Sequence, residues 1–141
     1  VEQYEMDNFA EIMNGGFWSL GDWVGASPDG LIGINGLFES KAPAYNTHMN
    51  YLIKGDIPRL YKWQLCGQLY VTDREWADFY SYHPRLPSLC KRVYRDEKQE
   101  NELKEQLSIA VERAENLMSD LEKLEPEMSR GVNKVITKEA V

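Results

Sequence analysis

Apolar residues recur along the chain with a helical period in four segments. Between positions 4 and 13 they alternate with acidic residues, which predicts an amphipathic helix over residues 2–14 that ends at Gly15-Gly16. A short helix is predicted over 47–53, and residues 59–70 carry apolar positions on two sides, as in a largely buried helix. Residues 96–125 show leucines and alanines at a three-four spacing within a highly charged background, which predicts a long surface helix.

Strand signals occupy the stretches between these helices. Residues 17–25 are typical of strand and turn. The segments 31–34 and 37–41 flank Asn35-Gly36, a dipeptide that favours a tight hairpin, so we expect two paired strands here. Residues 76–82 and 91–95 are further predicted strands, with a loop over 83–87.

Composition agrees with one soluble globular domain. The chain has 141 residues, a mean hydropathy of −0.54 and 43% hydrophobic residues. It has no run of 18 apolar residues, which excludes an ordinary membrane-spanning helix, and no signal peptide is visible. Two cysteines are too few for a disulfide scaffold or a four-cysteine metal site. The first residue is valine, so we expect the chain to begin inside a longer protein.

The charges are segregated along the chain. A net charge of −7 argues against nucleic acid as a partner, because a uniformly acidic surface repels phosphates. However, residues 1–40 hold seven acidic and no basic residues, residues 41–95 hold nine basic and four acidic ones, and residues 96–141 hold seven basic and twelve acidic ones. The basic middle segment therefore remains a candidate for contact with DNA.

The predicted hairpin brings together three residues that carry chemistry. Asp29 precedes the first strand, and Glu39 and Lys41 end the second, where residues two apart project from the same face. Pairing of the strands places Asp29 beside Glu39. Two carboxylates with a backbone carbonyl form a hard-oxygen site suited to Mg²⁺ or Mn²⁺, and a neighbouring lysine can activate water. This set is what metal-dependent phosphodiester hydrolysis requires.

These motifs, in this order, resemble one nuclease family. Ser27-Pro28-Asp29-Gly30-Leu31, followed by Glu39-Ser40-Lys41-Ala42-Pro43, is similar to the PD-(D/E)xK signature in the form found in the lambda exonuclease / YqaJ-type viral recombinase family. The segments 61–72 and 79–85 resemble that family's glutamine-containing helix and a later strand end. The resemblance implies an α/β fold with a restriction-endonuclease-like core, a central mixed β-sheet flanked by helices.

The resemblance also implies roles for individual residues. Asp29 and Glu39 would bind the metal with the backbone carbonyl of Ser40, and Lys41 would be the catalytic lysine. Gln64 matches the family's active-site glutamine, and Ser27 matches a serine near the 5′ phosphate. A further metal-site glutamate of the family would lie before Val1, so we expect residues 1–125 to form a nuclease core that lacks its N-terminal part, followed by a C-terminal tail over 126–141.

The implied function is a metal-dependent, 5′-to-3′ exonuclease on double-stranded DNA ends, of phage or prophage origin and cytoplasmic in the bacterial host. Its expected partners are DNA, a single-strand annealing protein and further copies of the chain, as a trimer. Basic residues in loops, which are suited to phosphate contacts, are Lys54, Arg59 and Arg85. The alternatives are an endonuclease or repair nuclease of the same fold, and a non-catalytic DNA-binding module.

Plainer structural roles remain open for several of these residues. Asp29 alone could be a turn residue, Lys41 a surface residue at a strand end, and Gln64 a buried amide bonded to a backbone carbonyl. His48 and His83 are interpreted as surface or loop residues, because no second ligand lies at zinc-binding spacing. Cys66 is interpreted as a small packing residue.

Overall fold

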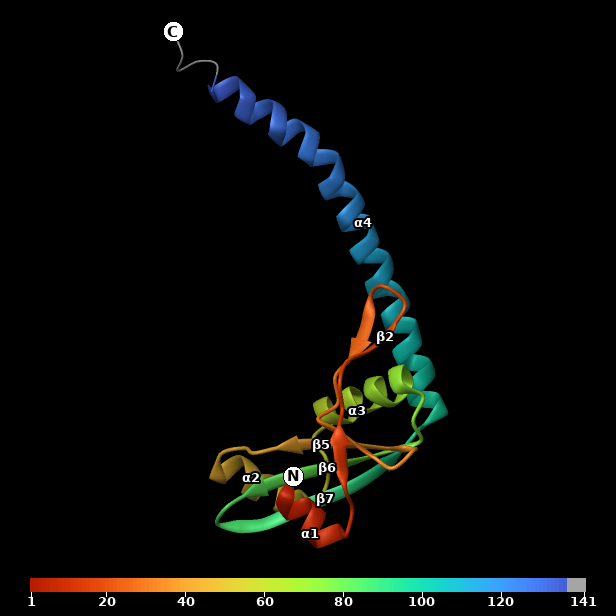
Figure 1. The fold of residues 1–141 in the computed structure, drawn as a ribbon, viewed down its shortest axis with the longest axis vertical. Coiled ribbons are helices and arrows are strands. Elements are labelled where there is room, and N and C mark those ends of the chain that lie inside the picture. Colours follow the sequence, from red (N-terminus) through yellow and green to blue (C-terminus); the bar gives the residue numbers. More distant parts are fainter. Residues whose placement is uncertain (137–141) are drawn as a thin grey trace. The chain divides into compact units, whose positions relative to one another are not determined.

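The computed structural model describes residues 1–136, and their side chains as far as residue 124. The chain divides into two compact units, Val1–Leu103 and the part that starts at Lys104, and each unit is described here by itself. The first unit contains the whole β-structure and the first three helices (Figure 1). The second contains most of the last helix. No helix within the described residues is long and apolar enough to cross a membrane.

A five-stranded mixed sheet forms the centre of the first unit, in the order β1-β4-β5-β6-β7. Only β5 and β6 are parallel among these neighbours, and the other pairs are antiparallel. A separate two-stranded sheet joins β2 and β3. The elements, in chain order, are α1 (Glu2–Asn8), β1 (Ile12–Asn14), β2 (Trp18–Leu20), β3 (Val24–Ala26), β4 (Gly30–Ile32), β5 (Gly36–Lys41), α2 (Tyr45–Lys54), α3 (Arg59–Thr72), β6 (Trp76–His83), β7 (Leu86–Tyr94) and α4 (Glu97–Ile136).

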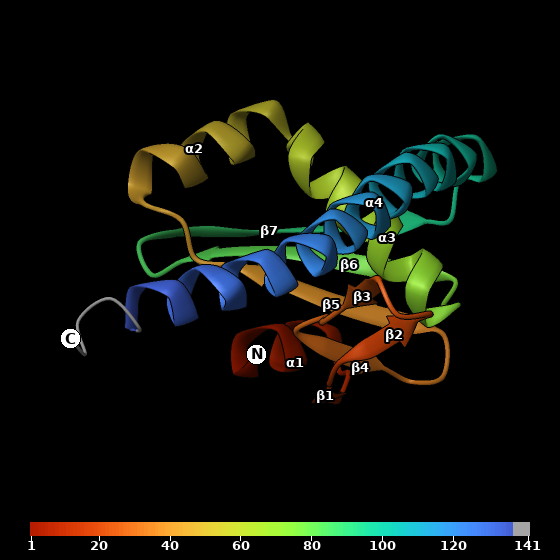
Figure 2. The ribbon, with the colours of Figure 1, turned by 90° about the horizontal axis from the view of Figure 1, so that it is seen from above.

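The helices lie on both faces of the sheet, with α2 and α3 on one face and α1 on the other (Figure 2). The α3 face is closed by a buried apolar cluster of Leu37, Ile57, Leu65, Leu69, Ala77 and Phe79. The α1 face is closed by Tyr4, Phe38 and Tyr80, whose rings lie 4.7–6.0 Å apart. The predicted mixed sheet flanked by helices is therefore confirmed.

The predicted helix over residues 2–14 is wrong in its second half. Helix α1 ends at Asn8, because Phe9 adopts a left-handed conformation (φ 50°, ψ 39°) that stops the helical turn. The backbone N–H of Ile12 then donates to the Glu5 carboxylate at 2.8 Å. Residues 12–14 pair with β4, so a distant strand outweighs the local helical pattern.

The predicted hairpin is confirmed, since β4 and β5 pair antiparallel, but its turn lies at residues 33–35 and not at Asn35-Gly36, because Gly36 pairs with Ile32 as the first residue of β5. Gly33 turns the chain with a φ of 55°, a conformation that suits glycine. The last helix is longer than predicted. It continues past residue 125 to Ile136, so residues 126–136 are helical rather than an irregular tail, while residues 137–141 lie outside the described residues. The functional boundary at residue 125 stays a prediction.

A buried polar contact attaches α1 to the sheet. The Tyr4 hydroxyl donates to Asp78 on β6, and Arg92 on β7 binds the same carboxylate through two hydrogen bonds of 2.7 and 2.8 Å. The Arg92 guanidinium also lies 3.6 Å from the centre of the Trp76 ring. Burial, and then the bond to Asp78, raise the pKa of the Tyr4 hydroxyl well above its ordinary value. The folded state therefore favours the neutral, protonated form of the Tyr4 hydroxyl.

Truncation of Phe38 tests the core on the α1 face. Phe38→Ala removes a ring that is 0% exposed and should lower the free energy of unfolding by about 3–5 kcal/mol. Phe9→Ala is the matched control, because Phe9 is 99% exposed and its loss should cost less than about 0.5 kcal/mol. Urea unfolding followed by circular dichroism measures both, and equal effects of the two substitutions would contradict this packing.

A second prediction concerns pH. Because folding raises the pKa of Tyr4, its contribution is complete below the unfolded value of about 10 and is lost as pH rises above it. The stability difference between the wild type and Tyr4→Phe should therefore change in favour of the variant by up to about 1.4 kcal/mol per pH unit above pH ~10. Urea unfolding at pH 9, 10 and 11 measures this difference, and a constant value would exclude a raised pKa.

Candidate active site

A buried carboxylate lies at the centre of the candidate site. Glu39 is 2% exposed and points from β5 toward α3, on the face that Leu37 and Phe79 otherwise make apolar. Lys41 and Gln64 both donate to its Oε1, Gln64 at 2.7 Å, and Gln68 donates to Oε2 at 2.8 Å. A buried carboxylate is tolerated only when it is paired and hydrogen-bonded, and these three donors supply both conditions.

Asp29 and Ser40 form the second half of the site. The Asp29 Oδ2 accepts hydrogen bonds from the backbone N–H of Ser40 at 2.8 Å and from its hydroxyl at 3.0 Å. The N–H and C=O of one strand residue point to the same side, so the Ser40 carbonyl also faces the edge where Asp29 lies. Strand β4 begins at Gly30, opposite Phe38, and so provides no backbone partner beside Ser40.

The ammonium group of Lys41 lies between a charge and an aromatic ring. It contacts Glu39 and lies 5.0 Å from the centre of the Tyr61 ring. Tyr61 in turn stacks on Phe79 with ring centres 5.4 Å apart. Burial raises the pKa of the Tyr51 hydroxyl, as does its hydrogen bond with Tyr61, so α2 supports the same ring. Lys41 is thus restricted to one side of Glu39.

The donor set fits a hard divalent cation. Asp29, Glu39 and the Ser40 carbonyl offer only oxygen atoms, within two neighbouring strand ends. The two carboxylates, Asp29 and Glu39, outnumber the single lysine, so the residues carry an excess negative charge that a divalent cation would offset. Among the described residues, no group of three or more His, Cys, Asp or Glu side chains could hold a metal, so water or substrate oxygens would have to complete the coordination.

A shallow groove of about 520 Å³ adjoins the site on the α1 side. It is lined by Val1, Glu2, Gln3 and Met6 of the N-terminal segment, by Ser40, Lys41 and Ala42, and by Tyr80 and Tyr82. The groove therefore starts at the end of β5, where Ser40 and Lys41 are also part of the site, and gives a ligand access to them.

The structure brings some predicted residues together and leaves others apart. Asp29 bonds to Ser40, Lys41 and Gln64 both bond to Glu39, and these two groups adjoin because Glu39, Ser40 and Lys41 are consecutive on β5. In contrast, the Ser27 hydroxyl donates to the Gly16 carbonyl at 3.0 Å. Three predicted DNA-contacting residues are exposed at element ends, Lys54 closing α2, Arg59 opening α3 and Arg85 in the β6–β7 turn. Within the described side chains, none of these three bonds to either group.

One side-chain prediction is wrong, and one of the open alternatives does not hold. The alternative for Gln64, a buried amide bonded to a backbone carbonyl, is excluded because Gln64 is exposed and its partner is the Glu39 carboxylate. His48 was expected at the surface, yet it is 0% exposed on α2, with Ser81 and the Pro87 carbonyl 2.8 Å from its two ring nitrogens. Both polar partners come from β6 and β7, so the local sequence around position 48 could not reveal them.

Gln68 and Tyr61 also belong to the site, although the sequence motifs do not single them out. Both lie on the same side of α3 as Gln64, because positions three and four apart share one helix face. That spacing is the signal that could have found them. Gln68 is 4% exposed, and its Oε1 has no hydrogen-bond partner in the structure. A buried unpaired acceptor costs about 1–3 kcal/mol, so the bond from its Nε2 to Glu39 comes with a penalty.

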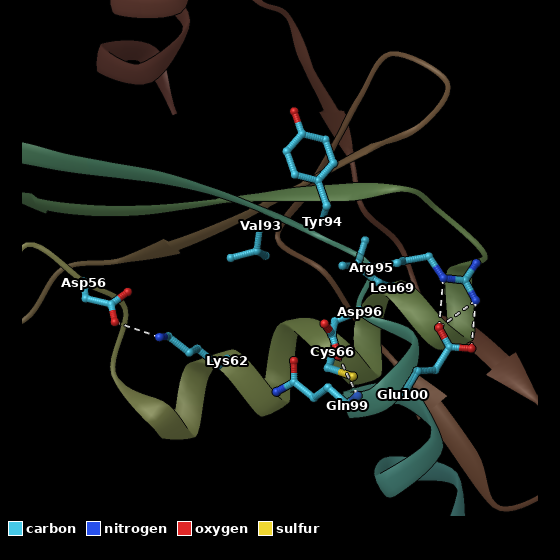
Figure 3. A pocket seen from close by; sticks show the side chains of 10 residues that line it. All are labelled: Asp56, Lys62, Cys66, Leu69, Val93, Tyr94, Arg95, Asp96, Gln99 and Glu100. Atoms are coloured by element: carbon cyan, nitrogen blue, oxygen red, sulfur yellow. Dashed lines mark hydrogen bonds and ion pairs between the residues drawn. The ribbon is translucent and has the colours of Figure 1, made fainter.

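A second cavity, of about 300 Å³, lies on another side of α3 (Figure 3). Lys62, Cys66 and Leu69 line it from α3, together with Asp56, residues 93–96, Gln99 and Glu100. Two ion pairs lie among the side chains that line this cavity. Lys62 pairs with Asp56 at 2.7 Å, and Arg95 pairs with Glu100 at 2.8 Å. Burial, and then the Glu100 and Asp96 charges, raise the pKa of the Cys66 thiol, which fits its predicted packing role.

Solved structures with this fold include two exonucleases. The chain is similar to an alkaline exonuclease (LHK-Exo) from Laribacter hongkongensis, with 29% identity, a TM-score of 0.83, and coverage of 90% of this chain and 69% of that one. It is also similar to the structure of LHK-Exo in complex with dAMP, with 30% identity and a TM-score of 0.79. That match covers 92% of this chain and 68% of the other. A phage related exonuclease from Haemophilus somnus 129PT shares the fold, with 13% identity, a TM-score of 0.63, and coverage of 86% and 68%.

The chain belongs to the YqaJ-like viral recombinase domain family, whose model matches residues 4–75. This segment includes most of α1, the hairpin that carries Asp29, Glu39 and Lys41, and all of α3. No curated protein matches the chain. The predicted family relationship is therefore confirmed.

Proposed function

We propose that the chain is the core of a metal-dependent nuclease that degrades double-stranded DNA from its ends, in the 5′-to-3′ direction, during phage-type recombination. The observation that carries the proposal is the Asp29–Ser40–Glu39–Lys41 cluster at the open end of β5. The similarity to an alkaline exonuclease at about 30% identity supports exonuclease rather than endonuclease activity. The family, described as viral recombinases, supports the role in recombination.

The proposed mechanism assigns each residue one task. Asp29, Glu39 and the Ser40 carbonyl would hold Mg²⁺ or Mn²⁺, which supplies a Lewis acid for the scissile phosphate and lowers the pKa of a bound water. Lys41, which is 25% exposed beside Glu39, would orient and so activate the attacking water, and its positive charge would stabilise the negative charge that develops at the phosphate. Gln64 fixes one carboxylate oxygen of Glu39 while its own side chain stays accessible to substrate.

DNA would approach the site along the basic middle segment. Lys54, Arg59 and Arg85 are exposed and can bind phosphates, and Ser27, which is also exposed, would have to exchange its bond to the Gly16 carbonyl for contact with a 5′ phosphate. The family relationship supports a bacterial cytoplasmic setting, a single-strand annealing protein as partner, and assembly into a homo-oligomer, which we propose is a trimer.

Removal of the Lys41 ammonium tests the catalytic assignment. With a linear duplex carrying 5′ phosphates, the full-length protein should release nucleotides in Mg²⁺ and stop in EDTA. Lys41→Ala should lower the rate about 10²–10³-fold, because the positive charge that orients the attacking water and offsets the developing negative charge is lost. Lys98→Ala, an exposed lysine at the start of α4, is the matched control and should keep the wild-type rate. An unchanged rate in Lys41→Ala would contradict the mechanism.

The same assay separates the alternatives. Strands labelled at the 5′ or the 3′ end should lose the 5′ label first, and covalently closed circles should resist degradation. Cleavage of closed circles would instead identify an endonuclease, and binding without cleavage in any metal would identify a DNA-binding module.

Arg59 and Arg85 test the proposed DNA path. Each alanine substitution should weaken binding of duplex DNA about equally across sequences and reduce the salt-dependence slope by about 1, because each removes one phosphate contact. Fluorescence anisotropy at several salt concentrations measures both values. A slope that equals the wild-type slope in both variants would show that DNA follows another path.

A further inference from the structure

Gln68 makes the deepest contact with the site. It is 4% exposed on α3, and its Nε2 donates to the Glu39 Oε2 at 2.8 Å. Gln64, one turn earlier, bonds the other carboxylate oxygen from an exposed position. Water can replace the Gln64 bond when that side chain is lost, whereas the buried Oε2 depends on Gln68.

The orientation of the Gln68 amide is fixed by chemistry. An ionised carboxylate only accepts hydrogen bonds, so the amide must turn its N–H₂ toward Glu39. Its Oε1 then points away and has no partner in the structure. A leucine of similar size would leave no unpaired oxygen here, so the value of glutamine at this position lies in its bond to Glu39 and not in packing.

We propose that Gln68 is a positioning residue that holds the Glu39 carboxylate in the orientation needed to bind the divalent cation. The inference rests on the proposed metal-dependent function. With Lys41 and Gln64 on Oε1 and Gln68 on Oε2, both oxygens are fixed and the plane of the carboxylate is set. Without Gln68 the Oε2 side is free, and the carboxylate rotates about its last side-chain bond. Partners that orient a metal ligand in this way typically change metal affinity 10–100-fold.

The experiment measures Mn²⁺ binding to the full-length protein by calorimetry, without DNA. Gln68→Leu should raise the Kd for Mn²⁺ about 10–100-fold, and Gln64→Leu should raise it less, because water replaces the exposed amide. Gln68→Met is the second variant in case leucine perturbs folding. Gln106→Leu, an exposed glutamine of α4, is the matched control and should bind as the wild type does. The melting temperature of the metal-free protein checks folding.

Nuclease rates then distinguish positioning from catalysis. At saturating Mn²⁺, Gln68→Leu should recover to within a few-fold of the wild-type rate, because only occupancy of the site was reduced. An unchanged Kd in both Gln68 variants would show that the residue only packs and would overturn the inference, even if the wild type cleaves DNA. A wild-type protein that binds no Mn²⁺ would overturn the proposed function and this inference together.

Discussion

The burial of the Glu39 carboxylate is the constraint around which the first unit is organised. The residue lies on a sheet face that is otherwise apolar, and a charge in that position is costly unless donors surround it. Two of its donors come from α3 and one from its own strand. The helix must therefore lie where its amides reach the end of β5, and this requirement fixes the separation of α3 and the sheet at the site.

The apolar contacts of α3 hold the helix in this same position against the sheet. Leu65 and Leu69 are buried against Leu37 and Phe79, on the helix side next to the one that carries Gln64 and Gln68. Apolar burial supplies the stability that a buried ion pair does not, since buried pairs are often no better than apolar replacements. The core and the site thus share one helix, and a shift of that helix would disturb both.

The sequence could predict what is local or encoded in a motif. The existence of the hairpin and the shared face of Glu39 and Lys41 follow from the local sequence and are confirmed, although the turn lies at residues 33–35 and not at Asn35-Gly36. The strand at Ile12 and the burial of His48 were not predictable in this way, because their partners lie some 20–40 residues away. Gln68 falls between these cases. Its helix face was visible in the sequence, but only the fold shows that Glu39 lies opposite.

The net charge of the chain is a poor guide to whether this site binds a phosphate-containing ligand. The acidic N-terminal segment includes Glu39, which the fold buries and pairs with Lys41, and Asp29, which stays exposed but bonds to the neighbouring Ser40. Another acid, Asp78, is neutralised by Arg92 beneath Tyr4. Glu39 and Asp78, which are buried and paired with a cation, contribute to the net charge of −7 while adding little to the field that a distant phosphate would meet. The sign of the net charge therefore carries less information about a ligand than the positions of these two buried acids.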